Sequence, residues 1–139
     1  MRLIVCLDDI NGMMFFGRRQ SCDRVLVAKL LSVTEGHRLF MTEYSKKIFP
    51  DCERITVCDD YLEAAGEEDF CFIENGPIDI ERASEVIICR WNRRYQADRF
   101  FEYDIAAEGF FKSSTEDIAG SSHERITVET YKRQEADTH

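Results

Sequence analysis

The first two thirds of the chain alternate between short apolar runs and longer polar or amphipathic stretches. Each run is continuously apolar and rich in β-branched residues, which is typical of strands buried on both faces of a parallel sheet. Segment 2–7 (RLIVCL) is the clearest example. The predicted strands of this part cover residues 2–7, 38–41, 54–58, 70–73 and 85–93.

The stretches between these strands carry helix signals. Ser21 is expected to cap a helix over residues 23–35, which ends at Gly36. Shorter helices are predicted over residues 43–49, 61–65 and 78–83. Residues 8–17 are predicted to form a loop. Strands and helices in this order predict a mostly parallel sheet with right-handed crossover connections.

The last third of the chain has a different pattern. Segments 109–115 and 126–131 alternate between apolar and polar positions, as the strands of a half-exposed antiparallel hairpin do. We therefore predict one α/β domain over residues 1–133. Its mixed, mostly parallel sheet is flanked by helices and ends in a C-terminal antiparallel hairpin. Residues 134–139 are predicted to be a frayed tail.

Composition narrows the classes of function. The chain has 139 residues and a formal net charge of −9, which disfavours binding to a nucleic-acid backbone. Its longest apolar runs are far shorter than the ~20 residues of a membrane-spanning helix, so no membrane partner is expected. The start of the chain does not resemble a secretion signal, and we expect a cytoplasmic protein with reduced thiols.

The six cysteines and three histidines do not have the spacing of a metal site. No two cysteines form a C-x-x-C pair, and the histidines are far apart in the sequence. Most of the cysteines lie in apolar segments, where a thiol behaves as a small hydrophobic group. Cys22, between Arg19 and Arg24, is the one candidate for a reactive thiol. No metal is predicted.

Three parts of the chain resemble dihydrofolate reductase. RLIVCLDDINGM at the start is similar to that family's first strand and the loop behind it. FCFIENG at 70–76 resembles its strand into a triple-glycine turn, and ADRFF at 97–101 with VETYKR at 128–133 resembles its last strands. The resemblance implies a dihydrofolate-reductase-like fold that lacks one strand, between Pro50 and Arg54.

The functional positions of that family match less well. Asp23 is the nearest match to the acidic residue that binds the pterin ring, and it is therefore our candidate catalytic residue. Glu43 stands at a helix start where the family binds a cofactor phosphate, and Glu74 and Asn75 replace two glycines of the turn near the pyrophosphate. Carboxylates at these points repel phosphate. We expect no cofactor, because the NADPH site of the family is degraded.

A closer similarity is to a small set of uncharacterised bacterial proteins, carried by residues 12–15, 18–21, 114–117 and 120–124. Some of these proteins are labelled ribonuclease Z. That activity requires several clustered histidines around two metal ions, and this sequence does not contain such a cluster. A hydrolase is therefore only our third hypothesis, after a protein that binds a small ligand and a protein-interaction module.

Candidate binding residues gather near the predicted crevice at the carboxyl ends of the strands. Arg18 and Arg19 precede a helix and would hold a carboxylate or phosphate there; alternatively, they pair with nearby aspartates. Asp8 and Asn11 follow the first strand and either face a ligand or cap the loop. The sequence leaves these alternatives open.

Two further clusters have alternative explanations. Residues 91–95 (WNRRY) have the composition of a base-stacking surface, but the net charge disfavours nucleic acid. Ser121 and Ser122 lie beside His123, and a Ser–His nucleophile needs the two within hydrogen-bond reach and a third orienting group. The ordinary composition of a hairpin loop accounts for these serines, and we favour that interpretation.

These observations favour a divergent protein of the dihydrofolate reductase fold that binds a small anionic ligand or nucleotide without NADPH-dependent reduction. The expected ligand-binding residues are Asp8, Asn11, Arg18, Arg19, Glu74 and Asn75. The alternative is a non-enzymatic interaction module whose acidic surface binds a basic protein. The sequence makes no prediction of the oligomeric state.

Overall fold

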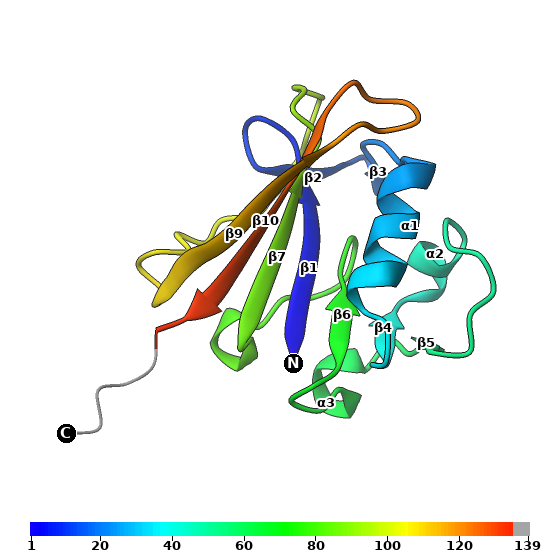
Figure 1. Ribbon diagram of the computed structural model, residues 1–139, viewed down its shortest axis with the longest axis vertical. Coiled ribbons are helices and arrows are strands. Elements are labelled where there is room, and N and C mark those ends of the chain that lie inside the picture. Colours follow the sequence, from blue (N-terminus) through cyan, green and yellow to red (C-terminus); the bar gives the residue numbers. More distant parts are fainter. Residues whose placement is uncertain (135–139) are drawn as a thin grey trace.

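The computed structural model describes residues 1–134, and its centre is a seven-stranded mixed sheet (Figure 1). The strands are β1 (Arg2–Leu7), β4 (Leu39–Met41), β5 (Ile55–Val57), β6 (Phe70–Phe72), β7 (Glu85–Arg90), β9 (Phe110–Ile118) and β10 (Ile126–Arg133). Their order is β5-β4-β6-β1-β7-β10-β9. The strands from β5 to β7 are parallel, and β10 pairs antiparallel with both β7 and β9. The predicted mixed, mostly parallel α/β fold with a C-terminal hairpin is confirmed.

The core lies on both faces of this sheet, which explains the continuous apolar runs. Successive side chains of a strand point to opposite faces. Leu3 and Val5 of β1 therefore join one buried cluster, and Ile4 joins the other. Helix α1 (Arg24–Val33) packs Leu26 and Leu30 into the cluster of Ile4. The remaining helical elements are α2 (Glu43–Lys46), α3 (Tyr61–Ala64) and the 3-10 turn η1 (Ile80–Arg82).

A second, three-stranded sheet replaces most of the loop predicted over residues 8–17. Its order is β3 (Arg18–Arg19), β2 (Gly12–Phe15) and β8 (Arg99–Phe100), all antiparallel. Phe16 and Gly17 form the two-residue turn between β2 and β3, with φ of 50° and 70°. The loop prediction was wrong here, because the pairing partner β8 comes from a distant part of the chain.

Several predicted boundaries also shift. Asp23, and not Ser21, caps α1, since its side chain accepts from the backbone N–H groups of Val25 and Leu26. Strand β9 continues to Ile118, beyond the predicted end at residue 115. No strand forms between α2 and β5, in residues 47–54 of the described chain. All but one residue of the predicted tail lie outside the described residues.

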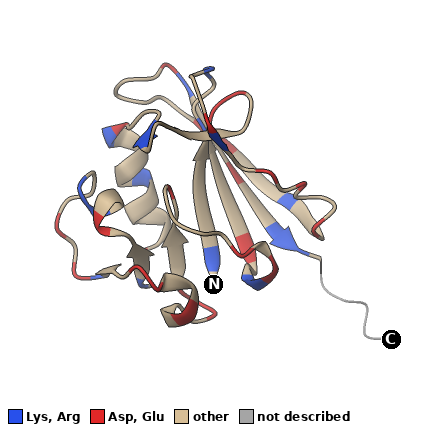
Figure 2. Cartoon of the chain, turned by 180° about the vertical axis from the view of Figure 1, so that it is seen from behind, with Lys and Arg blue, Asp and Glu red and all other residues tan. Residues whose placement is uncertain are grey.

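Charge is distributed unevenly over this fold (Figure 2). Residues 59–69, which lead into β6, contain six acidic residues and no lysine or arginine. Residues 90–99, at and beyond the end of β7, contain four arginines and one aspartate. Because β6 and β7 both run parallel to β1, the acidic segment lies at the amino ends of these strands and the arginine-rich segment at their carboxyl ends.

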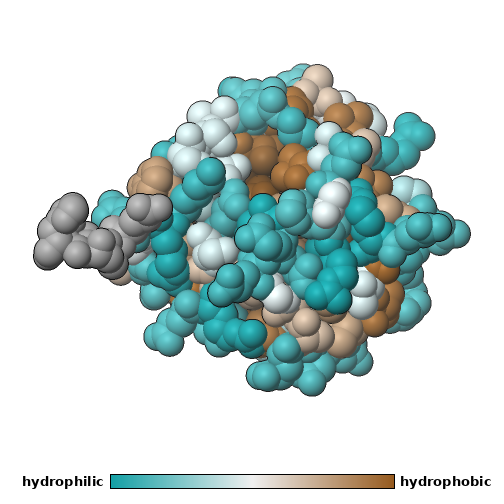
Figure 3. All heavy atoms as spheres, turned by 60° about the horizontal axis from the view of Figure 1, so that its bottom comes forward, coloured by the Kyte–Doolittle hydropathy of each residue, from teal (hydrophilic) through white to brown (hydrophobic). Residues whose placement is uncertain are grey.

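The surface is largely hydrophilic at the end of the molecule where β1 begins. Figure 3 shows this side covered mainly by hydrophilic residues, with hydrophobic atoms visible in a hollow.

Among residues 1–134, none of the helices combines the length and the apolar character that crossing a membrane requires.

Candidate functional site

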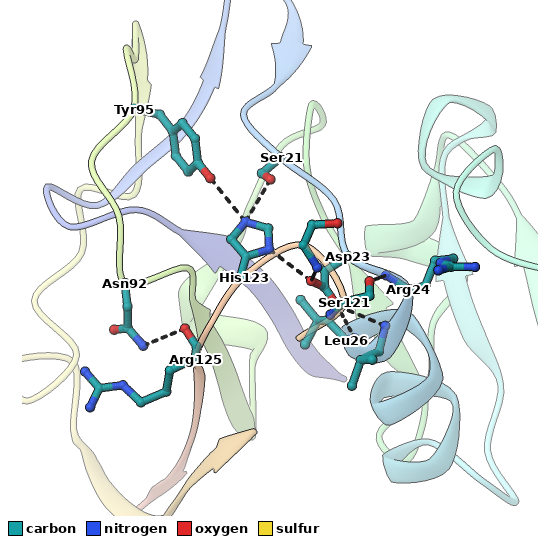
Figure 4. A network of polar contacts seen from close by, with 11 residues as sticks. Ser21, Asp23, Arg24, Leu26, Asn92, Tyr95, Ser121, His123 and Arg125 are labelled. Atoms are coloured by element: carbon teal, nitrogen blue, oxygen red, sulfur yellow. Dashed lines mark hydrogen bonds and ion pairs between the residues drawn. The ribbon is translucent and has the colours of Figure 1, made fainter. Parts of the chain in front are cut away.

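Three segments meet above the carboxyl ends of β1 and β7 (Figure 4). They are the chain that enters α1, the segment 91–95 that follows β7, and the hairpin loop 119–125 between β9 and β10. The loop crosses the first turn of α1, and Gly120 allows it to approach. A Cβ at Gly120 would lie 2.5 Å from Oδ2 of Asp23 and 2.9 Å from the carbonyl oxygen of His123.

Asp23 is the central acceptor of this region and is almost fully buried. Its Oδ1 accepts from the backbone N–H groups of Val25 (2.9 Å), Leu26 (3.2 Å) and Ser121 (3.0 Å). Its Oδ2 accepts from the N–H of Ser122 at 2.7 Å and from the His123 ring at 3.0 Å. Burial alone would raise the pKa of this carboxyl, but the hydrogen bonds from His123 and the backbone outweigh it and hold the pKa well below its ordinary value.

His123 is held on three sides. Its Nδ1 lies 3.0 Å from Oδ2 of Asp23. Its Nε2 lies 3.0 Å from Oγ of Ser21 and 3.1 Å from the hydroxyl of Tyr95. The ring stacks on Trp91 with a centroid separation of 4.6 Å and an angle of 23° between the planes. Stacking and hydrogen bonds together fix the orientation of the imidazole.

The space beside Asp23 is nearly closed. A cavity of about 10 Å³ remains there. It is lined by Cys6, Ser21, Cys22, Asp23, Leu26, Val27, Ile48, Phe72, Glu74 and Trp91. A volume of this size holds at most about one water molecule. The pterin ring that the resemblance associates with this acidic residue does not fit beside Asp23.

A larger cavity of about 710 Å³ opens on the other side of His123. Its lining consists of Trp91, Asn92, Arg93, Ser122, His123, Glu124 and Arg125. Arg93 and Arg125 are exposed, and in the described part of the chain their guanidinium groups form no ion pair or hydrogen bond. Asn92 holds two walls of this cavity together, because its amide donates to the carbonyl oxygen of Arg125 (3.2 Å) and to Oγ1 of Thr127 (2.9 Å).

Asp8 and Asn11 lie at the same end of the sheet but face protein groups. The buried Asp8 carboxylate accepts from the backbone N–H groups of Ile10, Gly12 and Tyr95 and from the side-chain amide of Gln20. Asn11 has a φ of 60°, and its Oδ1 accepts from Arg90 at 3.2 Å. These contacts stabilise the loop behind β1.

The two adjacent arginines have different surroundings. Arg19 forms a bidentate ion pair with Glu74, with Nε–Oε2 and Nη2–Oε1 distances of 3.0 and 3.1 Å. Its guanidinium also lies over the ring of Tyr44, at 4.2 Å from the centroid. Arg18 is exposed, and both arginines line a cavity of about 510 Å³ together with Arg94 and Tyr95. Arg19 therefore pairs with Glu74 and not with one of the nearby aspartates.

The place where the resemblance implies a cofactor phosphate is occupied by side chains. Oδ1 of Asn75 accepts from Oγ1 of Thr42, the N-cap of α2, at 3.0 Å. Glu74 accepts from Oγ of Ser45, in α2, at 2.8 Å, and Glu43 adds a further carboxylate to the first turn of this four-residue helix. Two carboxylates, and an Asn75 side chain that is hydrogen-bonded to the helix N-cap, do not fit a dinucleotide pyrophosphate.

The predicted residues therefore fall into separate groups. Arg19 and Glu74 contact each other, and Asp23 contacts His123, whereas Asp8, Asn11 and Asn75 each bind local protein groups. Arg125 was not among the residues predicted from the sequence. The serines considered beside His123 were those of its own loop, whereas the side chain that reaches its Nε2 is Ser21. The basic and aromatic composition of residues 91–95 was the available signal for one wall of the larger cavity.

Comparisons with known proteins agree with this architecture at the level of the fold. No family model matches the chain, and no curated protein sequence matches it. Among solved structures, it is similar to dihydrofolate reductase from Enterococcus faecalis complexed with NADP(H) and RAB-propyl, with a TM-score of 0.68. The sequence identity is 14%, and the match covers 96% of each chain. The chain therefore has the fold of dihydrofolate reductase.

Proposed function

We propose that this protein binds a small anionic ligand at the carboxyl ends of β1 and β7. The observation that carries the proposal is the cavity of about 710 Å³ with Arg93 and Arg125 in its wall. Small-molecule sites typically have volumes of roughly 300–1,000 Å³ and are placed outside the carboxyl ends of such strands. This cavity satisfies both conditions.

Charge supports an anion over a neutral ligand. Arg93 and Arg125 contribute two positive charges, and Glu124 is the one acidic residue of the lining. This local excess contrasts with a chain whose formal net charge is −9. The guanidinium of Arg93 lies 5.6 Å from the centroid of the Tyr95 ring. Because neither guanidinium forms an ion pair or hydrogen bond within the described residues, their N–H donors are available to a carboxylate or phosphate group.

The site differs from the substrate site implied by the resemblance. Asp23 already accepts five hydrogen bonds from protein groups, and the space beside it is about 10 Å³. A ligand in the larger cavity would instead contact Arg93, Arg125 and the part of His123 that lines this cavity. Reduction with NADPH is not part of this proposal.

Binding can be tested by calorimetry and thermal shift with inorganic phosphate, pyrophosphate, citrate and adenosine monophosphate as probes. We expect at least one probe to raise the melting temperature, with an affinity that falls as salt concentration increases. The double variant Arg93→Ala/Arg125→Ala should weaken binding by at least roughly 100-fold, since each charged hydrogen-bonding partner is worth about 1.5–3 kcal/mol.

The matched control removes two positive charges elsewhere. Lys47 and Lys132 are exposed and do not line the cavity, so Lys47→Ala/Lys132→Ala should leave the affinity within about twofold after correction for salt effects. If no probe binds, or if both double variants lose affinity equally, the cavity is not the binding site.

The interaction module is a second proposal, with its own observation. Residues 59–69 carry six acidic residues without a basic one, and this segment lies at the opposite end of the sheet from the cavity. A lysine-rich peptide that binds with strong salt dependence, and with equal affinity to the Arg93→Ala/Arg125→Ala variant, would favour it. No such binding at low salt would exclude it.

A further inference from the structure

Ser21, His123 and Asp23 are hydrogen-bonded in series (Figure 4). Oγ of Ser21 lies 3.0 Å from Nε2 of His123, and Nδ1 of the same ring lies 3.0 Å from Oδ2 of Asp23. The three residues come from the chain before α1, the hairpin loop and the N-cap of α1. A hydroxyl, an imidazole and a carboxylate in this order form the arrangement that activates serine nucleophiles on several unrelated folds.

The carboxylate determines which nitrogen of His123 carries the proton. Asp23 is ionised, because hydrogen bonds from His123 and the backbone hold its pKa well below the ordinary range in spite of burial. An ionised carboxylate only accepts hydrogen bonds. Nδ1 of neutral His123 must therefore carry the hydrogen and donate it to Asp23, which leaves the lone pair of Nε2 facing Ser21.

The imidazole of His123 is also held rigidly in place. The His123 side chain is 3% exposed and that of Asp23 is fully buried. The stack on Trp91 prevents the ring from turning away from Ser21. Ser21 is half-buried, and His123 contributes to the wall of the larger cavity. Ser21 itself lines the small cavity of about 10 Å³ and not the larger one, so an ester must reach its hydroxyl from the part of the side chain that is open to solvent.

We propose that Ser21 is a nucleophile that hydrolyses small carboxylic esters, with His123 as its general base and Asp23 as the residue that orients the imidazole. This activity goes beyond anion binding and does not depend on it, since none of the three residues is one of the cavity arginines.

The reaction is balanced with an ester and water alone. Oγ of Ser21 forms a bond to the carbonyl carbon while its proton passes to Nε2 of His123. The bond from that carbon to the alcohol oxygen breaks, and the alcohol leaves with the proton from Nε2. Water then adds to the acyl carbon by the same proton route, the bond to Oγ breaks, and the acid is released with Ser21 restored.

Tyr95 gives the proposal a distinctive test. Its hydroxyl lies 3.1 Å from the same Nε2, so it competes with Ser21 for the single lone pair of that nitrogen. In Tyr95→Phe, the Ser21 hydroxyl is the remaining side-chain donor to Nε2 among the described residues. The reactivity of Ser21 should therefore rise, which a purely structural role of the network does not predict.

The experiment is labelling of the full chain with an alkyl fluorophosphonate, with the modified residue identified by mass spectrometry, alongside hydrolysis of p-nitrophenyl acetate. We expect Ser21 to be labelled and Ser21→Ala to reduce hydrolysis to the background rate. His123→Asn should slow labelling by roughly 100-fold or more, the usual contribution of a general base. Tyr95→Phe should accelerate it.

The control variant is Ser32→Ala, since Ser32 is an exposed serine of α1 outside the network; it should behave as the unmodified protein. Circular dichroism and melting temperatures identify variants that fail to fold. Tyr95→Phe and Ser21→Ala keep the test valid if His123→Asn unfolds. Absence of label on Ser21 in the folded unmodified protein and in Tyr95→Phe, with hydrolysis unchanged in Ser21→Ala, would overturn the proposal.

Discussion

His123 and Asp23 are 100 residues apart in the sequence and are joined by a hydrogen bond of 3.0 Å between Nδ1 and Oδ2. The same carboxylate caps α1 and accepts from the backbone of Ser121 and Ser122 in the hairpin loop. One buried side chain thus fixes both the start of a helix and the position of a loop. The stability of the whole region is expected to depend on it.

We predict that Asp23→Ala lowers the free energy of unfolding by roughly 3–4 kcal/mol, because each buried N–H group that loses its acceptor costs about 1–3 kcal/mol. Urea unfolding followed by circular dichroism measures this loss. Asp60 is the matched control, since it is the N-cap of α3 but makes no side-chain cap bond. Asp60→Ala should change stability by less than about 0.5 kcal/mol; similar losses in both variants would contradict the proposed role of Asp23.

The contribution of Asp23 should also depend on pH. The pKa of its carboxyl is lowered in the folded protein, so the unfolded chain binds the proton more readily. The stabilisation is therefore complete above the ordinary aspartate pKa of about 3.9 and is lost progressively as the pH falls below it. The difference in unfolding free energy between the unmodified protein and Asp23→Asn should shrink between about pH 5 and pH 2. A difference that stays constant over this range would disprove the linkage.

Gly120 is predicted to be intolerant of a side chain. A Cβ at this position would stand 2.5 Å from Oδ2 of Asp23 and 2.9 Å from the carbonyl of His123, so the loop must move away from α1. Gly120→Ala should cost about 1–3 kcal/mol and reduce the protection of the loop amides from hydrogen exchange. Gly66→Ala is the comparison, because the nearest atom there is at an ordinary 3.4 Å; equal losses would argue against the clash.

The fold could be predicted from the sequence because its main signals are local. β1 and β7 are continuous apolar runs, and such runs are typical of central parallel strands. Asp23 became the acidic candidate through the resemblance to dihydrofolate reductase, at the start of the predicted helix 23–35. The second sheet was missed because β2 pairs with β8 across more than eighty residues, a relationship that no local pattern of residues 8–17 encodes.

The site was harder to predict for the same physical reason. Which acid neutralises Arg19 depends on how β6 and α2 meet, and Glu74 is 55 residues away. Adjacent residues also hid the partner of His123: Ser121 and Ser122 are its neighbours in sequence, but Ser21, 102 residues away, reaches its ring. Which side chains lie close together depends on the order of the strands in the sheet, and that order is known only from the structure.

The turn between β2 and β3 contains a residue that is unfavourable for its backbone. Phe16 has a φ of 50° and is 78% exposed, whereas two-residue hairpin turns of this type favour Asn or Gly. Phe16→Gly should therefore raise the free energy of unfolding by about 0.5–1 kcal/mol. Phe16→Ala keeps the strain while removing the ring and should not stabilise. A gain of equal size in both variants would assign the effect to the exposed ring instead of the backbone.

The Arg19–Glu74 pair is predicted to couple the second sheet to the main one. Burial would lower the pKa of Arg19, but the hydrogen bonds that its guanidinium donates to Glu74 outweigh burial and raise the pKa. A double-mutant cycle of Arg19→Ala and Glu74→Ala should give a coupling energy of about 1–3 kcal/mol, since the side chains are only 19% and 9% exposed. The cycle for Lys46 and Asp51, where the aspartate is fully exposed, should give less than about 0.5 kcal/mol. A coupling for Arg19 and Glu74 as small as that of the exposed pair would mean that Arg19 is free to serve a ligand.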